Sequence, residues 1–192
     1  MSNTTNTVNV WDPFIRIFHW TLVLSFFIAY ITEEDFLTIH TFAGYTILTL
    51  LTLRIIWGLI GTRYARFSDF SYSPQTIKEF IKDTFYLRAK RYLGHNPAGG
   101  AMVFLIIISL LITTLTGVAM YGIKEQAGPL SNWYMQKDSL WGDVFKETHE
   151  FFSNFSLLLV FIHVTGVIVE SFIHKENLVE SMIDGKKRLD TK

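Results

Sequence analysis

Four long apolar stretches dominate the chain, and polar segments separate them. They cover about 14–31, 38–60, 99–122 and 148–172. An α-helix needs about 20 mostly apolar residues to cross a bilayer, and each stretch comes close to or exceeds that length. The pattern therefore predicts an all-α integral membrane protein, folded as a four-helix bundle in a single domain over 1–192.

Basic residues are unevenly distributed among the segments that connect these spans. The first connection, "TEEDFL", is acidic, and the third has only Lys124, Lys137 and Lys146. The second connection and the tail hold most of the others: Arg63, Arg66, Lys78, Lys82, Arg88, Lys90, Arg91, Lys175, Lys186, Lys187, Arg188 and Lys192. Because cytoplasmic segments are enriched in Lys and Arg, both termini are predicted to be cytoplasmic and the spans to run up-down-up-down. The polar start lacks a basic n-region, so the first span is expected to be retained.

The second connection has a helical pattern of its own. Ser73 is a suitable N-cap and Pro74 a suitable first helical residue. Apolar residues then follow at helical spacing: Ile77, Phe80, Ile81 and Phe85. We predict an amphipathic helix in the inner membrane interface, and the alternative is a solvated loop helix. The third connection, with its Gly-Pro turn signal, is expected to form a small outer cap.

The composition fits a membrane protein and narrows its chemistry. Hydrophobic residues make up 49% of the chain and charged residues 18%, and cysteine is absent. The absence of cysteine excludes disulfides, thiolate-ligated clusters and covalently attached haem. A metal or cofactor therefore depends on histidine, carboxylate or methionine. We expect no nucleic-acid partner.

Histidines stand out because ionisable side chains are costly inside a membrane. His149 and His163 are fourteen residues apart, and about 100° per residue brings them to within about 40° of one helix face. The predicted topology places His40 level with His149, and His19 level with His163. Two level pairs at two depths predict bis-histidine ligation of two b-type haems. The alternatives are separate structural histidines and a haem-free transporter that relays protons.

Small and basic residues near these histidines support the same hypothesis. Gly44 follows His40 by one helical turn, Gly166 follows His163 by three residues, and Gly117 shares a helix face with Gly99. The missing side chains would let a flat porphyrin approach, although close helix packing is an alternative interpretation.

Arg54 follows His40 by fourteen residues and is therefore predicted to lie on nearly the same helix face, at the inner level. There it could pair with a haem propionate. The alternative is that the side chain snorkels to the membrane interface.

Several segments resemble the bacterial cytochrome b-561 family: "VWDPFIRIFHW", "IHTFAGYTILTLLTLRIIWGLIG" and "GHNPAGG", together with the paired histidines of the fourth span. That family is similar to the b-type cytochrome subunits of nickel-iron hydrogenases and to the gamma subunit of formate dehydrogenase. The resemblance extends from about Val10 to Lys175, includes the Arg16 to Trp20 motif, and implies ligand roles for His19, His40, His149 and His163. It also implies a four-helix, di-haem cytochrome that exchanges electrons with quinone.

The expected function is electron transfer across the bacterial inner membrane, between quinone and a periplasmic redox partner such as a c-type cytochrome. A superoxide oxidase that reduces ubiquinone is the alternative, but Glu125, Asp138, Asp143 and Glu147 nearly cancel the outer lysines. An inner quinone site is expected near four basic residues: Arg16, Arg54, His95 and His174. These residues could instead anchor the protein to anionic lipid, and His95 could be only a loop cap or a solvated side chain. A homodimer is left open.

Overall fold

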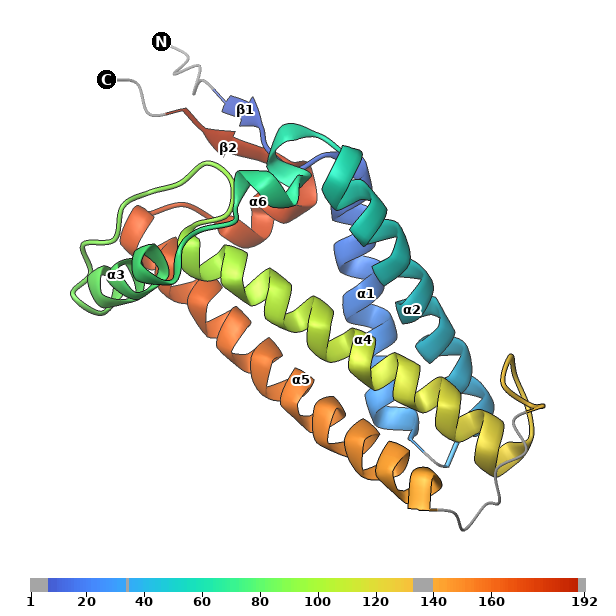
Figure 1. Ribbon diagram of the computed structural model, residues 1–192. Helices are drawn as coiled ribbons and strands as arrows, with labels where there is room; N and C mark the ends of the chain where they lie inside the picture. Colours follow the sequence, from blue (N-terminus) through green and yellow to red (C-terminus); the bar gives the residue numbers. More distant parts are fainter. Residues whose placement is uncertain (1–6, 34, 133–139, 190–192) are drawn as a thin grey trace. The chain divides into compact units, whose positions relative to one another are not determined.

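The computed structural model describes residues 7–33, 35–132 and 140–189. Four helices are long and apolar enough to cross a membrane: α1 (Pro13–Thr32), α2 (Leu37–Ile60), α4 (Pro97–Glu125) and α5 (Leu140–His174) (Figure 1). Each predicted span lies inside one of them, so the four-helix membrane bundle is confirmed. The orientation of the helices in the bilayer stays a prediction.

Hydroxyl side chains within these helices bond to their own backbones. Thr46, Thr49 and Thr52 of α2 each donate to the carbonyl four residues earlier, at 2.9 Å. A lipid environment offers no water to a hydroxyl group, so this local bond satisfies it at little cost. Polar residues can therefore remain in an apolar helix without breaking it.

The chain forms two compact units, and each of the four long helices contributes a part to both. Unit 1 comprises Met1–Trp20, Leu53–Val103 and Ile162–Lys192, whereas unit 2 comprises Thr21–Thr52 and Phe104–Phe161. His19 and His163 belong to unit 1, and His40 and His149 belong to unit 2. The single-domain organisation stays a prediction.

The ends of the described chain pair within unit 1, an arrangement that the hydrophobic pattern does not predict. Strand β1 (Thr7–Asn9) runs antiparallel to β2 (Lys186–Arg188), with Val8 opposite Lys187 (Figure 1). Between α5 and β2 lies the short helix α6 (Leu178–Asp184). It ends at Gly185, which adopts a left-handed conformation at φ 85° that favours glycine. The Gly185 carbonyl accepts hydrogen bonds from the backbone N–H groups of Val10 and Trp11, and so ties the tail to the start of α1.

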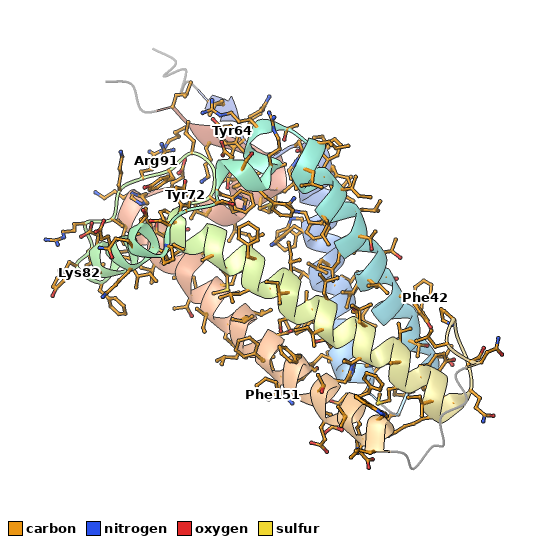
Figure 2. All side chains as sticks on the ribbon, in the orientation of Figure 1. Phe42, Tyr64, Tyr72, Lys82, Arg91 and Phe151 are labelled. Carbon is orange, nitrogen blue, oxygen red and sulfur yellow. The ribbon has the colours of Figure 1, made fainter. Side chains whose placement is uncertain are left out.

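The second connection also belongs to unit 1. It contains two 3-10 helices, η1 (Arg63–Ala65) and η2 (Phe67–Asp69), followed by α3 (Pro74–Phe85). The Ser73 hydroxyl accepts a hydrogen bond from the Thr76 N–H at 3.1 Å, so the predicted helix and its cap are confirmed. Lys82 projects from α3 in Figure 2. The location of α3 in the membrane interface stays a prediction.

Polar contacts hold the helices of unit 2 together. The Tyr30 hydroxyl of α1 donates to Asn154 Oδ1 of α5 at 2.9 Å. The hydroxyls of Ser109 on α4 and Ser156 on α5 lie 2.8 Å apart, and both residues are buried. Small residues that pair in this way allow membrane helices to approach closely. Phe151 projects outward from α5 in Figure 2, as expected for a side chain that faces lipid. The predicted outer cap lies partly outside the described residues, as do Lys137 and Asp138.

Candidate cofactor site

His40 and His149 face each other in unit 2. Their ring centres are 6.0 Å apart, and the ring planes meet at 64°. Two metal–imidazole bonds of about 2 Å, plus about 1 Å from each nitrogen to its ring centre, also give a separation of about 6 Å. The two rings are therefore spaced to accept one metal ion between them.

Backbone carbonyls orient both rings of this pair. His40 Nδ1 donates to the Ala29 carbonyl at 2.9 Å, and His149 Nδ1 donates to the Thr113 carbonyl at 2.8 Å. A carbonyl oxygen can only accept a hydrogen bond, so each Nδ1 carries the proton. The lone pair on each Nε2 is consequently free to bind a metal, which is the usual arrangement of a ligating histidine and its second hydrogen bond.

Gly117 of α4 makes room for one of these rings. A Cβ atom at this position would lie 2.9 Å from His149 Cε1 and 3.1 Å from its Nδ1. The close approach of a porphyrin to Gly117 stays a prediction; what the structure shows is that this glycine lets the imidazole of His149 reach the carbonyl of Thr113. Gly44 differs from Gly117, since a Cβ atom there would meet nothing within 4 Å.

If the His40/His149 pair binds a haem as predicted, Gly117→Ala should reduce the content of that haem by more than half. The added methyl group must shift the His149 ring by roughly half an ångström, which weakens its hydrogen bond to Thr113 and moves a candidate ligand out of position. Absorption spectra of the purified protein measure the loss. Ser109→Ala is a matched control, because it alters a buried residue on the same helix without crowding the ring. Full haem content in Gly117→Ala would contradict the assigned role.

His19 and His163 form the corresponding pair in unit 1. Their ring centres are 6.4 Å apart, and the ring planes meet at 56°. The spacing again matches two imidazoles on one metal ion. This pair differs from the first in its hydrogen bonding, because His19 Nδ1 is buried without a hydrogen-bond partner among the described residues.

Unit 1 also contains other buried nitrogen atoms without hydrogen-bond partners among the described residues: Arg16 Nε, Arg54 Nη1, His95 Nδ1 and His174 Nε2. An unsatisfied buried donor costs about 1–3 kcal/mol, and more when it is charged. A group with several anionic oxygen atoms, such as the propionates of a haem, would satisfy donors of this kind. The donor set of unit 1 therefore fits a haem.

Arg54 is the most deeply buried of these residues, with 3% of its surface exposed. Its guanidinium stacks over the Phe67 ring, 4.8 Å from the ring centre. A snorkelling side chain would expose its charged end. The snorkelling interpretation therefore does not fit this structure.

Arg16 has a second role at the C-terminal segment. Its Nη1 donates to the Ile183 carbonyl at 2.5 Å, and Trp20 Nε1 donates to the Met182 carbonyl at 3.3 Å. The Arg-x-x-His-Trp motif thus anchors α6 beside His19. The buried Nε of Arg16 has no hydrogen-bond partner among the described residues, so it is available for the predicted contact with a cofactor.

His95 lies between two aromatic rings and is not a freely solvated side chain. Its ring centre is 4.8 Å from that of Trp11 and 4.3 Å from that of Phe70. Burial, followed by the positive charges of Arg54 and Lys187, lowers the pKa of His95 to about 3. His95 is therefore neutral at physiological pH and can donate only one hydrogen bond.

This low pKa predicts an acid-sensitive structure. In the unfolded chain histidine binds a proton near pH 6.5, whereas folded His95 binds one only near pH 3. The unfolded state therefore takes up more protons between these values, and the stability falls as the pH decreases from about 6.5 toward 4. We expect a cost of about 2 kcal/mol at pH 5. Thermal unfolding as a function of pH measures it.

His95→Phe should make that decline shallower by the contribution of His95, because the aromatic contacts remain but this titrating group is lost. Asp12 and Glu176 do not interfere, since hydrogen bonds outweigh burial and lower the pKa of each below its ordinary value of 3.8 or 4.5. The contributions of these two carboxylates to stability are therefore lost only at a lower pH. If stability fell with pH between 6.5 and 4.5 as steeply in His95→Phe as in the wild type, the prediction would be contradicted.

The remaining geometry also fits a flat macrocycle. A Cβ atom at Gly166 would meet nothing within 4 Å, as at Gly44, so the helix beside each histidine pair is open. Among the described residues, no group of three or more His, Cys, Asp or Glu side chains could hold a metal ion. Metal binding by a histidine pair therefore requires further ligands, which the four nitrogens of a porphyrin supply.

Several features of the two sites could not be identified from residue types. The acceptors for His40 and His149 are backbone carbonyls, and any residue could provide them. Glu170 of α5, which is only 8% exposed and bonds to Asn96, was also not identified. A carboxylate within the last apolar span is a signal that could have led to it.

Comparisons with known proteins show which family and which relatives this chain is similar to. The model of the family described as prokaryotic cytochrome b561 matches residues 10–185. A probable Ni/Fe-hydrogenase B-type cytochrome subunit of Rhizobium leguminosarum bv. viciae is 28% identical, over 94% of this chain and 89% of the relative. The protein of the same description from Cupriavidus necator is 26% identical, over 92% of this chain and 85% of the relative.

A shorter match involves a probable Ni/Fe-hydrogenase 1 B-type cytochrome subunit of Escherichia coli K12. It is 27% identical over 61% of both chains. The family model covers most of this chain, including all four candidate ligands. The chain therefore belongs to the prokaryotic cytochrome b561 family, and it is a multi-pass membrane protein that transfers electrons by means of haem b.

Proposed function

We propose that this protein transfers electrons across the bacterial inner membrane through two b-type haems, each held by two histidines. The proposal rests on the two histidine pairs, with ring centres 6.0 Å and 6.4 Å apart in separate units. His40 and His149 would bind the outer haem. His19 and His163 would bind the inner haem. Haem iron, when bound, supplies the one-electron chemistry.

The protein's own contribution is to orient the ligands, to make space for the cofactors and to compensate their negative charge. Backbone carbonyls set the tautomers of His40 and His149 before a metal binds, which reduces the rearrangement needed for ligation. Buried Arg54, 3% exposed, would place a positive charge beside the inner haem. Gly44 and Gly166 leave space along the helices for the porphyrin plane.

We place the quinone site beside the inner haem. Quinone carbonyls need hydrogen-bond donors, and unit 1 holds the buried, unsatisfied Nδ1 of His95 close to the positive charge of Arg54, whose Nη1 is assigned to the haem propionates. Anchoring to anionic lipid explains these two residues less well, because a lipid anchor must reach the surface. His174, another of the basic residues predicted near this site, is mostly buried, and its Nε2 lies 3.2 Å from Oε2 of buried Glu170.

The partner is proposed to be a redox protein on the periplasmic side. A c-type cytochrome is one candidate. The matched relatives are described as cytochrome subunits of Ni/Fe-hydrogenases, so a hydrogenase-type redox enzyme is a second candidate. Both would exchange electrons with the outer haem.

The test begins with the purified protein. We expect two b haems per chain by haem extraction and two components in a redox titration. A short-chain quinol should reduce both haems, and a quinone-analogue inhibitor should perturb the spectrum of the inner haem. One haem per chain, or none, would refute the di-haem proposal. An inhibitor shift confined to the outer haem would refute the inner quinone site. Faster reduction by superoxide than by any redox protein would favour the superoxide oxidase.

A further inference from the structure

A small polar cavity lies in unit 1 beside the last turns of α5. Its volume is about 30 Å³, which is enough for a water molecule. Charged and polar side chains dominate its lining: Arg91, Asn96, Glu170, His174, Glu176 and Lys187. The electron-transfer role of the histidine pairs requires no such cluster.

Glu170 is the unusual member of this cluster, because it is a carboxylate in a membrane-spanning helix. It is 8% exposed. It follows His163 by seven residues in the continuous helix α5, so it lies within about 20° of the same helix face and about 10 Å along the axis. Buried ionisable groups in membrane helices commonly mark proton or ion pathways. Glu170 is therefore placed close to the candidate inner haem.

The surroundings of Glu170 can satisfy its side chain with or without a proton. Asn96 Nδ2 donates to Oε2 at 3.1 Å, and the Thr84 hydroxyl donates to Oε1 at 3.2 Å. The same hydroxyl is also 3.0 Å from the Phe80 carbonyl, so it can donate there instead. Its oxygen would then accept a hydrogen bond from a protonated Oε1.

Glu176, the other carboxylate of the cavity, is bound differently. Arg91 donates two hydrogen bonds to it, at 3.1 Å and 2.7 Å, and the Arg188 N–H donates a third at 3.1 Å. Burial alone would raise the pKa of Glu176, but these bonds outweigh burial and lower it. Glu176 is thus held as a carboxylate, whereas the hydrogen-bond partners of Glu170 fit its side chain with or without a proton.

We propose that Glu170, with His174 beside it, is the proton donor and acceptor for quinone at the inner haem. The inference rests on the proposed quinone function. Reduction of a quinone to a quinol consumes two electrons, which arrive through the inner haem, and two protons, one on each carbonyl oxygen. In each transfer the O–H bond of protonated Glu170 breaks, and an O–H bond forms on a quinone oxygen. A proton from the solvent then returns to the carboxylate, passing through a water molecule in the cavity and through His174. Quinol oxidation reverses these steps.

The charged groups around Glu170 come from several elements. His174 lies on α5, with Nε2 3.2 Å from Glu170 Oε2, and Arg91 lies in the loop before α4. Lys187 of β2, 7% exposed, and Glu176 complete the charged lining. Burial lowers the pKa of Lys187, and Glu176 and Glu170 partly oppose that effect. The cavity thus holds two carboxylates and three basic groups.

The test is Glu170→Gln, which keeps the shape of the side chain and most of its hydrogen bonds but cannot hold a transferable proton. Glu180→Gln is the matched control, because Glu180 is exposed on α6 and is not part of the cavity lining. Pre-reduced protein is mixed with a short-chain ubiquinone, and haem reoxidation is followed by stopped flow across a pH range. We expect Glu170→Gln to retain both haems, to react at least tenfold more slowly and to lose the wild-type pH dependence. Glu180→Gln should match the wild type.

A second measurement does not depend on turnover. The wild-type protein should show a carboxyl band in the infrared difference spectrum when the haems are reduced, and Glu170→Gln should lack it. Absence of this band in the wild type would overturn the inference even if the variant failed to fold. A wild-type protein that reacts with quinone, together with a Glu170→Gln variant that reacts equally fast, would also overturn it while leaving the proposed function intact. A wild-type protein that does not react with quinone would instead refute the proposed function.

Discussion

Alanine at His40 or at His149 should remove one and the same b haem and leave the other in place. The two rings are 6.0 Å apart, and neither imidazole can hold the metal in six-coordinate form alone. Alanine at His19 or His163, with rings 6.4 Å apart, should remove the other haem. Haem content should fall from two to one in each of the four variants. Low-temperature reduced-minus-oxidised spectra distinguish the two haems.

A control for this experiment is Tyr30→Phe. It removes the hydrogen bond from Tyr30 to Asn154 in the unit that contains His40 and His149, but it leaves every candidate ligand in place. We expect this variant to keep both haems. The pairing would be refuted if His40→Ala and His149→Ala depleted different haems. Loss of both haems in each histidine variant would point to unfolding. Circular dichroism of those variants, compared with that of Tyr30→Phe, would test for it.

Arg54→Gln should lower the reduction potential of the inner haem. Adding an electron to a haem is easier beside a buried positive charge, and Arg54 is 3% exposed with Nη1 lacking a hydrogen-bond partner among the described residues. Loss of the charge therefore favours the oxidised haem. We expect a decrease of roughly 60 mV or more, since about 59 mV corresponds to a tenfold change in the equilibrium constant for one electron. The outer haem serves as an internal reference in the same titration.

Arg63→Gln is the matched control for Arg54→Gln. Arg63 belongs to the same unit and also stacks on an aromatic ring, that of Tyr64, but its side chain is 75% exposed. Solvent and salt screen an exposed charge, so this substitution should scarcely move either potential. An inner potential that did not change in Arg54→Gln would show that the guanidinium does not lie near the inner haem.

Features set by local periodicity were predictable. Runs of about 20 apolar residues are typical of membrane-spanning helices, and all four lie in observed helices. The cap at Ser73 is equally local, because a hydroxyl three residues before a free N–H suffices to define it. The separation of His149 and His163 on one continuous helix follows from the helical rise and rotation alone.

The pairing of chain ends was not predictable in the same way. Strands β1 and β2 have three residues each and lie far apart along the chain. Such short segments carry no measurable alternation, and their pairing depends on the tail returning to Val10 and Trp11 through Gly185. Helix α6 is likewise too short to show a clear periodicity.

The sequence by itself determined the membrane helices, the absence of cysteine chemistry and the four histidines available as ligands. Helix geometry and apolar length decide these features, and both can be counted along the chain. Only the tertiary structure showed which nitrogen of His40 and His149 carries the proton, why Gly117 must be small and that Arg54 is buried. These properties depend on backbone carbonyls and neighbouring rings that come from other helices. No local pattern records which helices meet, because packing in three dimensions brings distant residues together.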